Sequence, residues 1–193
     1  MRSRATTKAT WSRSSSSDTL LSSGIGNIAL TGFMAVGKTV VGRRLARRLE
    51  WRFVDLDRAI EETAGMKVQE IFKRKGEAFF RELEKQKLNE ILRQERQVIA
   101  TGGGAVLDEE NLRLLKEKSL LIYLTATPQT LLRRSGGGSG RPLLEGGDGK
   151  RRIQELLSRR EKSYAQAHAS IDTDSLSVED VVERIMQVVQ SQA

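Results

Sequence analysis

The sequence predicts an α/β fold in which helices cover both faces of a parallel sheet of about five strands. Short, continuously apolar runs alternate along the chain with longer stretches whose apolar residues recur at helical spacing. A strand that is apolar on both sides is typical of a parallel sheet buried between two helical layers. With 193 residues, of which 38% are hydrophobic, the chain can form one domain with a short lid or tail.

A glycine-rich turn joins the first expected strand to the first expected helix. Asn27–Thr31 (NIALT) is apolar and predicts a buried strand. Residues 39–50 predict a helix, with Val40, Leu45 and Leu49 on its core side. This order of elements is the one expected at the start of a parallel sheet.

The same alternation continues to the end of the chain. Pro128 suits the first turn of a helix, where its missing N–H is not needed. Residues 136–149 are rich in glycine and predict a mobile loop. Further strands are expected at Arg52–Asp55, 98–101, 120–124 and 170–172, and helices within 56–94 and at 108–116, 151–168 and 178–189.

Residues 1–23 differ in composition from the rest of the chain. They are rich in serine and contain a single acidic residue, which predicts a disordered N-terminal extension before a domain at 24–193. The extension lacks the apolar centre of a secretory signal, although its arginines and serines also fit an organelle transit peptide. We therefore expect a cytoplasmic protein, with an organelle as the alternative location.

Composition excludes several kinds of site. The chain has no cysteine, which rules out disulfides and zinc–thiolate sites, and its one histidine, His168, rules out a metal site built on several imidazoles. The net charge is +8, and basic residues are concentrated at 133–160. That concentration suggests a polyanionic partner, either nucleotide phosphate or nucleic acid, and the alternative is a solvated arginine-rich helix. Tyr164, just beyond this segment, is the only aromatic residue near it, so a nucleic-acid partner is not expected.

The strongest motif is Gly32–Thr39 (GFMAVGKT), which fits G-x-x-x-x-G-K-[ST] without a mismatch. Backbone N–H groups of such a loop surround a phosphate chain, and the helix N-terminus adds unpaired donors. Lys38 is expected to reach the β- and γ-phosphates, and the Thr39 hydroxyl to ligate Mg²⁺. The sequence lacks the N-K-x-D segment of a GTPase, and residues 98–101 do not end in an acid as in ATPase motors. A small kinase is the best interpretation.

Five motifs together resemble shikimate kinases in their order and spacing, from about residue 27 to about residue 189. They are GFMAVGKTVVGRRLA, the Asp55-Leu56-Asp57 triplet, FRELE at 80–84, TGGGAV at 101–106 and RPLL at 141–144. The resemblance implies a P-loop NTPase-type fold, similar to nucleoside monophosphate kinases, with strand order 2-3-1-4-5. It also implies a substrate-binding region at about 56–92 and a lid at about 136–149.

The implied activity is that of a phosphotransferase with an alcohol group as acceptor. It would transfer the γ-phosphoryl group of ATP to the 3-hydroxyl of shikimate, giving 3-phosphoshikimate and ADP, in chorismate and aromatic amino acid synthesis. Mg²⁺ is the implied cofactor. The expected partners are shikimate and ATP, with neither nucleic acid nor membrane, and the expected state is a monomer.

Two aspartates are candidates for the reacting end of the site. A spacing of two along a strand would point Asp55 and Asp57 the same way, at the carboxyl end of the second strand, where ligands bind. Asp55 is expected to hold Mg²⁺ through water together with Thr39, unless it only caps the next helix. Asp57 is expected to bind the substrate hydroxyl and to accept its proton.

The other end of the substrate carries a carboxylate, for which the resemblance implies Arg81 and Arg160. A planar guanidinium binds a carboxylate through two parallel hydrogen bonds. Glu84 is expected to orient Arg81 from one helical turn away. Gly102, Gly103 and Gly104 would let a flat hydroxylated ring lie against backbone.

The nucleotide is expected to contact the loop, the lid and one further arginine. The resemblance implies that Arg141 closes on the phosphates and, with Lys38 and Asp57, serves catalysis. It also implies that Arg134 stacks on adenine. The full expected set of ATP-binding residues is Gly32, Met34, Ala35, Val36, Gly37, Lys38, Thr39, Val40, Arg134 and Arg141.

The chain departs from the usual family pattern at three places. Ala35 stands where glycine is common, which costs about 1 kcal/mol if the position needs a positive φ. Lys162 and Ser163 stand where the family tends to have Pro-Leu, and the third departure is the N-terminal extension. A different small-molecule kinase, such as a gluconate kinase, and a regulatory homologue without catalysis are the remaining alternatives. The intact FRELE and GGG segments disfavour the first, and the intact P-loop and aspartates disfavour the second.

Overall fold

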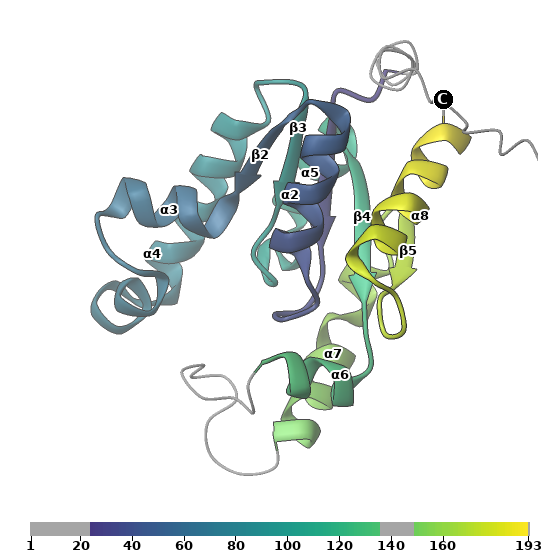
Figure 1. The fold of residues 1–193 in the computed structure, drawn as a ribbon. Helices are drawn as coiled ribbons and strands as arrows, with labels where there is room; N and C mark the ends of the chain where they lie inside the picture. Colours follow the sequence, from purple (N-terminus) through teal and green to yellow (C-terminus); the bar gives the residue numbers. More distant parts are fainter. Residues whose placement is uncertain (1–23, 136–148, 193) are drawn as a thin grey trace, which may run out of the picture.

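The computed structural model describes residues 24–135 and 149–192, and in these the chain forms three layers (Figure 1). A five-stranded parallel sheet in the order β2-β3-β1-β4-β5 lies between two groups of helices. The α/β class and the strand order expected from the sequence are therefore confirmed. The expected disordered extension at 1–23 and most of the expected lid, 136–148, lie outside the described residues, and so does Arg141.

The strands match the apolar runs closely. Their bounds are β1 Asn27–Thr31, β2 Arg52–Asp55, β3 Gln97–Ala100, β4 Leu120–Thr125 and β5 Ala169–Asp172. Every residue of β1 is buried, because successive side chains of this central strand face opposite helical layers. Ile28 and Leu30 pack in one cluster with Leu45 of α2 and Ile185 of α8. Ala29 lies in the other, with helices α3 to α5.

The helices begin where capping chemistry allows them to. Asp108 accepts hydrogen bonds from two backbone N–H groups at the start of α5, and Ser177 forms a capping box with Asp180 at the start of α8. Pro128 occupies the first turn of α6, as predicted. The helical elements are α2 Lys38–Leu49, α3 Leu56–Ala64, α4 Val68–Ile91, η1 Ala105–Leu107, α5 Glu109–Lys118, α6 Pro128–Arg134, α7 Gly149–Tyr164 and α8 Val178–Ser191.

Two local expectations were wrong. Val40 is 59% exposed, and the neighbouring Val41 faces the core instead, whereas Leu45 and Leu49 are buried as predicted. Helix α7 ends at Tyr164 instead of continuing to His168. The His168 backbone N–H donates to the Leu121 carbonyl, and the His168 Nδ1 accepts from the Leu121 N–H at 2.9 Å. These two bonds pair His168 with Leu121 of β4 and keep it out of the helix.

Helix α4 contains a break that the sequence pattern did not predict. Gly76 has φ 84° and ψ 171° inside the helix, a conformation that favours glycine because it lacks a Cβ. The α3–α4 region forms a separate lobe beside the sheet (Figure 1). None of the helices in the described part of the chain is long and apolar enough to cross a membrane.

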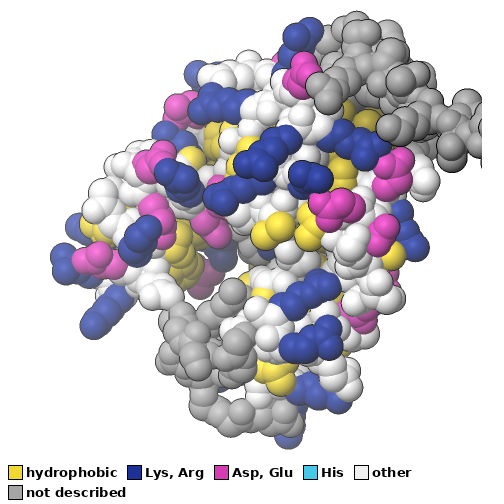
Figure 2. All heavy atoms as spheres, in the orientation of Figure 1, with side chains coloured by type: hydrophobic (Ala, Val, Ile, Leu, Met, Phe, Trp, Pro, Cys, Tyr) yellow, Lys and Arg dark blue, Asp and Glu magenta, His cyan; other side chains and the backbone are white. Residues whose placement is uncertain are grey.

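Basic side chains lie over α6 and α7, as the charge distribution indicated (Figure 2). Arg151 pairs with Glu155 one turn away on the exposed face of α7, at 3.1 Å. Surface pairs of this kind contribute little to stability.

Candidate active site

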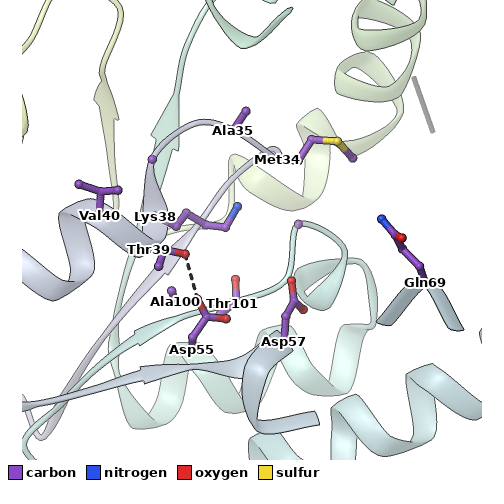
Figure 3. A pocket seen from close by; sticks show the side chains of 12 residues that line it. Met34, Ala35, Lys38, Thr39, Val40, Asp55, Asp57, Gln69, Ala100 and Thr101 are labelled. Atoms are coloured by element: carbon purple, nitrogen blue, oxygen red, sulfur yellow. Dashed lines mark hydrogen bonds between the residues drawn. The ribbon is translucent and has the colours of Figure 1, made fainter. Parts of the chain in front are cut away.

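A cavity of about 560 Å³ opens at the carboxyl ends of the central strands (Figure 3). This edge of a parallel sheet is where ligands bind in open α/β folds. The cavity is bordered by the loop between β1 and α2, the end of β2 with the start of α3, and the turn after β3. Residues lining it are Met34, Ala35, Gly37, Lys38, Thr39, Val40, Asp55, Asp57, Gln69, Ala100, Thr101 and Gly103.

The glycine-rich loop is formed tightly against the sheet. Gly32 has φ 140°, and a Cβ at this position would lie 2.3 Å from the Leu124 carbonyl oxygen, so only glycine fits. The Lys38 ammonium donates hydrogen bonds to the carbonyls of Gly32 and Phe33, at 2.8 and 3.0 Å. Lys38 therefore lies folded over the loop, at the place where a phosphate would meet the start of α2.

Ala35 adopts a left-handed backbone conformation, with φ 63°. Position 35 therefore does use a positive φ, which is the case in which the sequence predicted an energetic cost for alanine. A left-handed residue other than glycine costs on the order of 1–2 kcal/mol, so the loop carries local strain.

Thr39 and Asp55 meet at the floor of the cavity. The Thr39 hydroxyl donates to Asp55 Oδ2 at 2.9 Å (Figure 3). Asp55 also caps α3 by accepting from the Arg58 N–H through Oδ1, at 3.4 Å. The helix-capping interpretation of Asp55 is therefore confirmed, and its role in holding Mg²⁺ stays a prediction, with the other carboxylate oxygen facing Thr39.

Asp57 lines the same cavity, but not for the reason expected. It lies in the first turn of α3 and not on the strand, because β2 ends at Asp55. Its carboxylate points into the cavity across from Gln69 of α4 (Figure 3). Burial raises the pKa of Asp57, Lys38 opposes that rise, and the negative charges of Asp55 and Glu61 add to it.

Arg81 and Glu84 form the predicted pair, one helical turn apart on α4. Arg81 Nη1 donates to Glu84 Oε2 at 2.6 Å, and Arg81 also contacts Glu77. Glu84 is 0% exposed, and its Oε1 has no hydrogen-bond partner among the described residues. Burial raises the pKa of Glu84, against the opposing influence of Arg81.

Two of the three glycines after β3, Gly102 and Gly104, lie against charged side chains of the site. A Cβ on Gly102 would lie 2.8 Å from Asp57 Oδ1 and 3.0 Å from Glu84 Oε1. A Cβ on Gly104 would lie 2.6 Å from Arg81 Nη2. Contacts this short do not occur at real Cβ atoms, so side chains here would displace these three charged groups.

Arg160 reaches the same turn from α7. Its Nη1 donates to the Gly103 carbonyl at 3.3 Å, and its guanidinium lies 5.6 Å from the centre of the Phe33 ring. Arg160 thus lies beside both the glycine turn and the phosphate loop. The substrate-binding role expected of Arg160, despite the departures at Lys162 and Ser163, stays a prediction.

Arg134 is fixed by hydrogen bonds in the plane of its guanidinium group. It donates to the Val36 carbonyl at 3.2 Å and to the hydroxyl and carbonyl of Thr173 at 2.9 and 2.7 Å. These bonds use the edge of the group and leave its faces for stacking. Arg134 also links the phosphate loop to the segment that follows β5.

Two residues near the site were not predicted from the sequence. Gln69 lines the cavity because the turn between α3 and α4 brings the start of α4 back toward β2, which depends on tertiary folding. Tyr164 contacts the glycine turn through its hydroxyl, although the sequence pattern served only to place Arg160.

Comparison with known proteins gives one consistent result. The family model described as "Shikimate kinase" matches residues 34–190. A shikimate kinase of Moorella thermoacetica is 47% identical over 166 residues, covering 86% of this chain and 95% of the relative. A shikimate kinase of Geobacter sulfurreducens is 45% identical over 178 residues, covering 92% of this chain and 95% of the relative.

Solved structures agree with these sequence relatives. A shikimate kinase from Acinetobacter baumannii in complex with shikimate superposes with a TM-score of 0.83 at 34% identity, covering 90% of this chain and 97% of that one. A shikimate kinase from Bacteroides thetaiotaomicron superposes with a TM-score of 0.79 at 35% identity, over 86% of this chain and 98% of that one.

Proposed function

The chain belongs to the shikimate kinase family and has shikimate kinase activity (EC 2.7.1.71), and from this premise we propose how its residues divide the work. The γ-phosphoryl group of ATP is transferred to the 3-hydroxyl of shikimate, giving 3-phosphoshikimate and ADP. Catalysis of this kind depends on positioning and charge neutralisation more than on covalent chemistry.

The phosphate chain of ATP binds in the Gly32–Thr39 loop. The backbone N–H groups at the start of α2 point toward the cavity and favour an anion there. When phosphate binds, Lys38 exchanges its present acceptors, the carbonyls of Gly32 and Phe33, for phosphate oxygens. The in-plane hydrogen bonds of Arg134 orient its face for stacking on adenine.

Thr39 and Asp55 fit a magnesium ion. Their oxygens lie 2.9 Å apart at the floor of the cavity, and oxygen donors are the ligands that Mg²⁺ prefers. Few protein ligands are needed, because Mg²⁺ usually keeps several waters and takes the rest of its ligands from phosphate. When bound with ATP, the ion supplies charge neutralisation at the phosphates. Thr39 of α2 and Asp55 at the end of β2 would hold it, and Asp57 is left for the substrate.

Asp57 binds the 3-hydroxyl of shikimate and accepts its proton. A carboxylate whose pKa is raised by burial is a better base than an exposed one, and this is the direction the environment of Asp57 imposes. The nearby ammonium of Lys38 keeps the carboxylate ionised and ready to act.

Arg81 and Arg160 bind the carboxylate of shikimate from either side of the glycine turn. Arg81 is oriented by the buried Glu84, and Arg160 by the Gly103 carbonyl. The Acinetobacter relative, solved in complex with shikimate, supports shikimate as the acid that is bound. Gly102 and Gly104 let Asp57 and Arg81 lie directly against the turn, because a Cβ on either glycine would meet these side chains.

The observation that carries this proposal is that three charged side chains approach the glycine turn at 102–104. Asp57, Glu84 and Arg81 all lie within 3.0 Å of where side chains on Gly102 and Gly104 would be. A base and a carboxylate-binding arginine therefore border one small space next to the phosphate loop. A hydroxy acid acceptor fits that arrangement.

ADP release coupled to a reporter enzyme tests the proposal, with shikimate, quinate and gluconate offered in turn. We expect ADP release only with shikimate, and a large fall in kcat for Asp57→Asn with a smaller change in KM. Glu62→Gln, an exposed change on the same helix, is the matched control and keeps wild-type rates. Equal turnover of gluconate, or wild-type kcat in Asp57→Asn, contradicts the proposal.

A further inference from the structure

The side chain of Tyr164 is buried, yet its hydroxyl reaches the candidate active site. Tyr164 is 1% exposed, and its ring stacks on that of Tyr123, with centres 4.7 Å apart and an angle of 12° between the planes. The hydroxyl donates a hydrogen bond of 2.6 Å to the carbonyl oxygen of Gly103. The ring thus belongs to the core, and the polar end of the side chain belongs to the glycine turn.

The Gly103 carbonyl is shared by two donors from α7. Tyr164 donates from the end of the helix, and Arg160 donates to the same oxygen at 3.3 Å from one turn earlier. A carbonyl oxygen has two lone pairs, so it can accept both bonds at once. The position of Arg160 therefore depends on an acceptor that Tyr164 also holds.

Gly103 also packs against the phosphate loop. A Cβ on Gly103 would lie 3.3 Å from the Gly32 carbonyl oxygen and 3.6 Å from the Met34 nitrogen. The residue therefore lies where three segments meet: the phosphate loop, the turn after β3 and helix α7. A small rotation of its peptide group would move the wall of the cavity and release Arg160.

We propose that Tyr164 is a positioning residue for shikimate binding. Its hydroxyl fixes the Gly103 peptide and, through the shared carbonyl, holds the Arg160 guanidinium beside the Phe33 ring. This inference rests on the proposed function, because it takes Arg160 as a ligand of the substrate carboxylate. It assigns a role in the reaction to the last residue of α7, which does not itself touch the substrate.

The test is Tyr164→Phe, which removes the hydroxyl and keeps the stacked ring. Loss of one buried hydrogen bond corresponds to about fivefold in an equilibrium constant, so we expect KM for shikimate to rise about fivefold. KM for ATP is expected to stay within about twofold of wild type, because the phosphate loop keeps its own bond from the Val36 N–H to the Phe33 carbonyl.

Tyr123→Phe is the matched control, since it makes the same chemical change on the partner ring. It is expected to leave both KM values unchanged. A second variant places para-aminophenylalanine at position 164, which restores an N–H donor on the same ring and is expected to lower KM for shikimate again. Arg160→Lys combined with Tyr164→Phe is expected to cost less than the two single changes together, because both act on one carbonyl.

The outcomes separate this inference from the proposed function. If the wild type shows no saturable dependence on shikimate, the proposed function fails. If the wild type is active and Tyr164→Phe shows a wild-type ratio of the two KM values, only the role of Tyr164 fails. A lower melting temperature with unchanged KM values would place the hydroxyl in stability alone and overturn the inference. If Tyr164→Phe does not fold, the amino variant is the test, and a KM for shikimate about fivefold above wild type in spite of its N–H donor would overturn the inference.

Discussion

Replacing Arg81 by alanine should have two separable effects, one on substrate binding and one on stability. The structure shows why: Arg81 faces the glycine turn with one side of its guanidinium and pairs with the fully buried Glu84 through Nη1. Removing one member of a buried, hydrogen-bonded charge pair that binds a ligand costs roughly 2–5 kcal/mol. At the lower end this is about a 30-fold rise in KM for shikimate. KM for ATP is expected to change little.

The stability effect comes from Glu84, which would lose its principal partner. Breaking a buried pair costs about 3–5 kcal/mol, and because the Arg81 side chain is 30% exposed we expect the lower part of this range. The pKa of Glu84 is already raised by burial, and it should rise further without Arg81. A carboxyl with a raised pKa in the folded state binds its proton more tightly there, so stability falls as pH rises through that pKa. Arg81→Ala should therefore be least destabilised in mild acid.

Combining Arg81→Ala with Glu84→Gln separates the two effects. The glutamine removes the buried charge, so the double variant should regain much of the lost stability at neutral pH while KM for shikimate stays high. Thermal unfolding and ADP-release kinetics on the four proteins of this cycle measure both quantities. A double variant with a wild-type KM for shikimate would show that Arg81 supports only the fold. Equal rises in both KM values would point to the phosphate side of the site, and Arg159 would be the next candidate for the carboxylate.

Three more predictions test the nucleotide side and the base. Lys38→Ala should lower kcat by orders of magnitude with an unchanged melting temperature, because its charge acts on the transferring phosphoryl group; wild-type turnover would refute that role. Ala35→Gly should raise the free energy of unfolding by up to about 1 kcal/mol, measured by urea denaturation, since φ is 63°; a loss of stability would show that the strain is negligible. The acid limb of kcat should have its midpoint above 3.8, the usual pKa of an aspartate, because protonation of Asp57 removes the base; the limb should disappear in Asp57→Asn.

Contiguous features of the site could be predicted from the sequence, and features set by packing could not. The phosphate loop is encoded in eight adjacent residues, Gly32–Thr39, whose chemistry and neighbouring elements are local. The Arg81–Glu84 pair follows from helical spacing alone. Val40 shows the opposite case: a valine in the first turn of α2 could face either way, and the core selected Val41. The break at Gly76 and the approach of Gln69 depend on how α4 folds back on the sheet.

The monomeric state, the cytoplasmic location and the roles of Arg141 and residues 1–23 stay predictions, since the described residues do not test them. Asp57 shows a more informative limit. Asp57 lies in the cavity as predicted, but on helix α3 and not on the strand to which it was assigned. Any short connection from β2 into α3 keeps the second residue after the strand at the carboxyl edge of the sheet. Asp57 would therefore border the cavity whether it lay on a strand or on a helix.

The position of the three glycines also depends on residues far from them in the sequence. A run of glycine usually indicates backbone conformations closed to other residues, yet Gly104 has φ −110°, which any residue adopts. What excludes a side chain is the ring of charged groups around the turn: Asp57, Glu84 and Arg81 occupy the positions that a Cβ would need. These groups come from α3 and α4, and no local pattern near residue 102 reports their presence. The glycines therefore mark where Asp57 and Arg81, the proposed base and the proposed carboxylate ligand, approach one turn, and only the folded arrangement shows this approach.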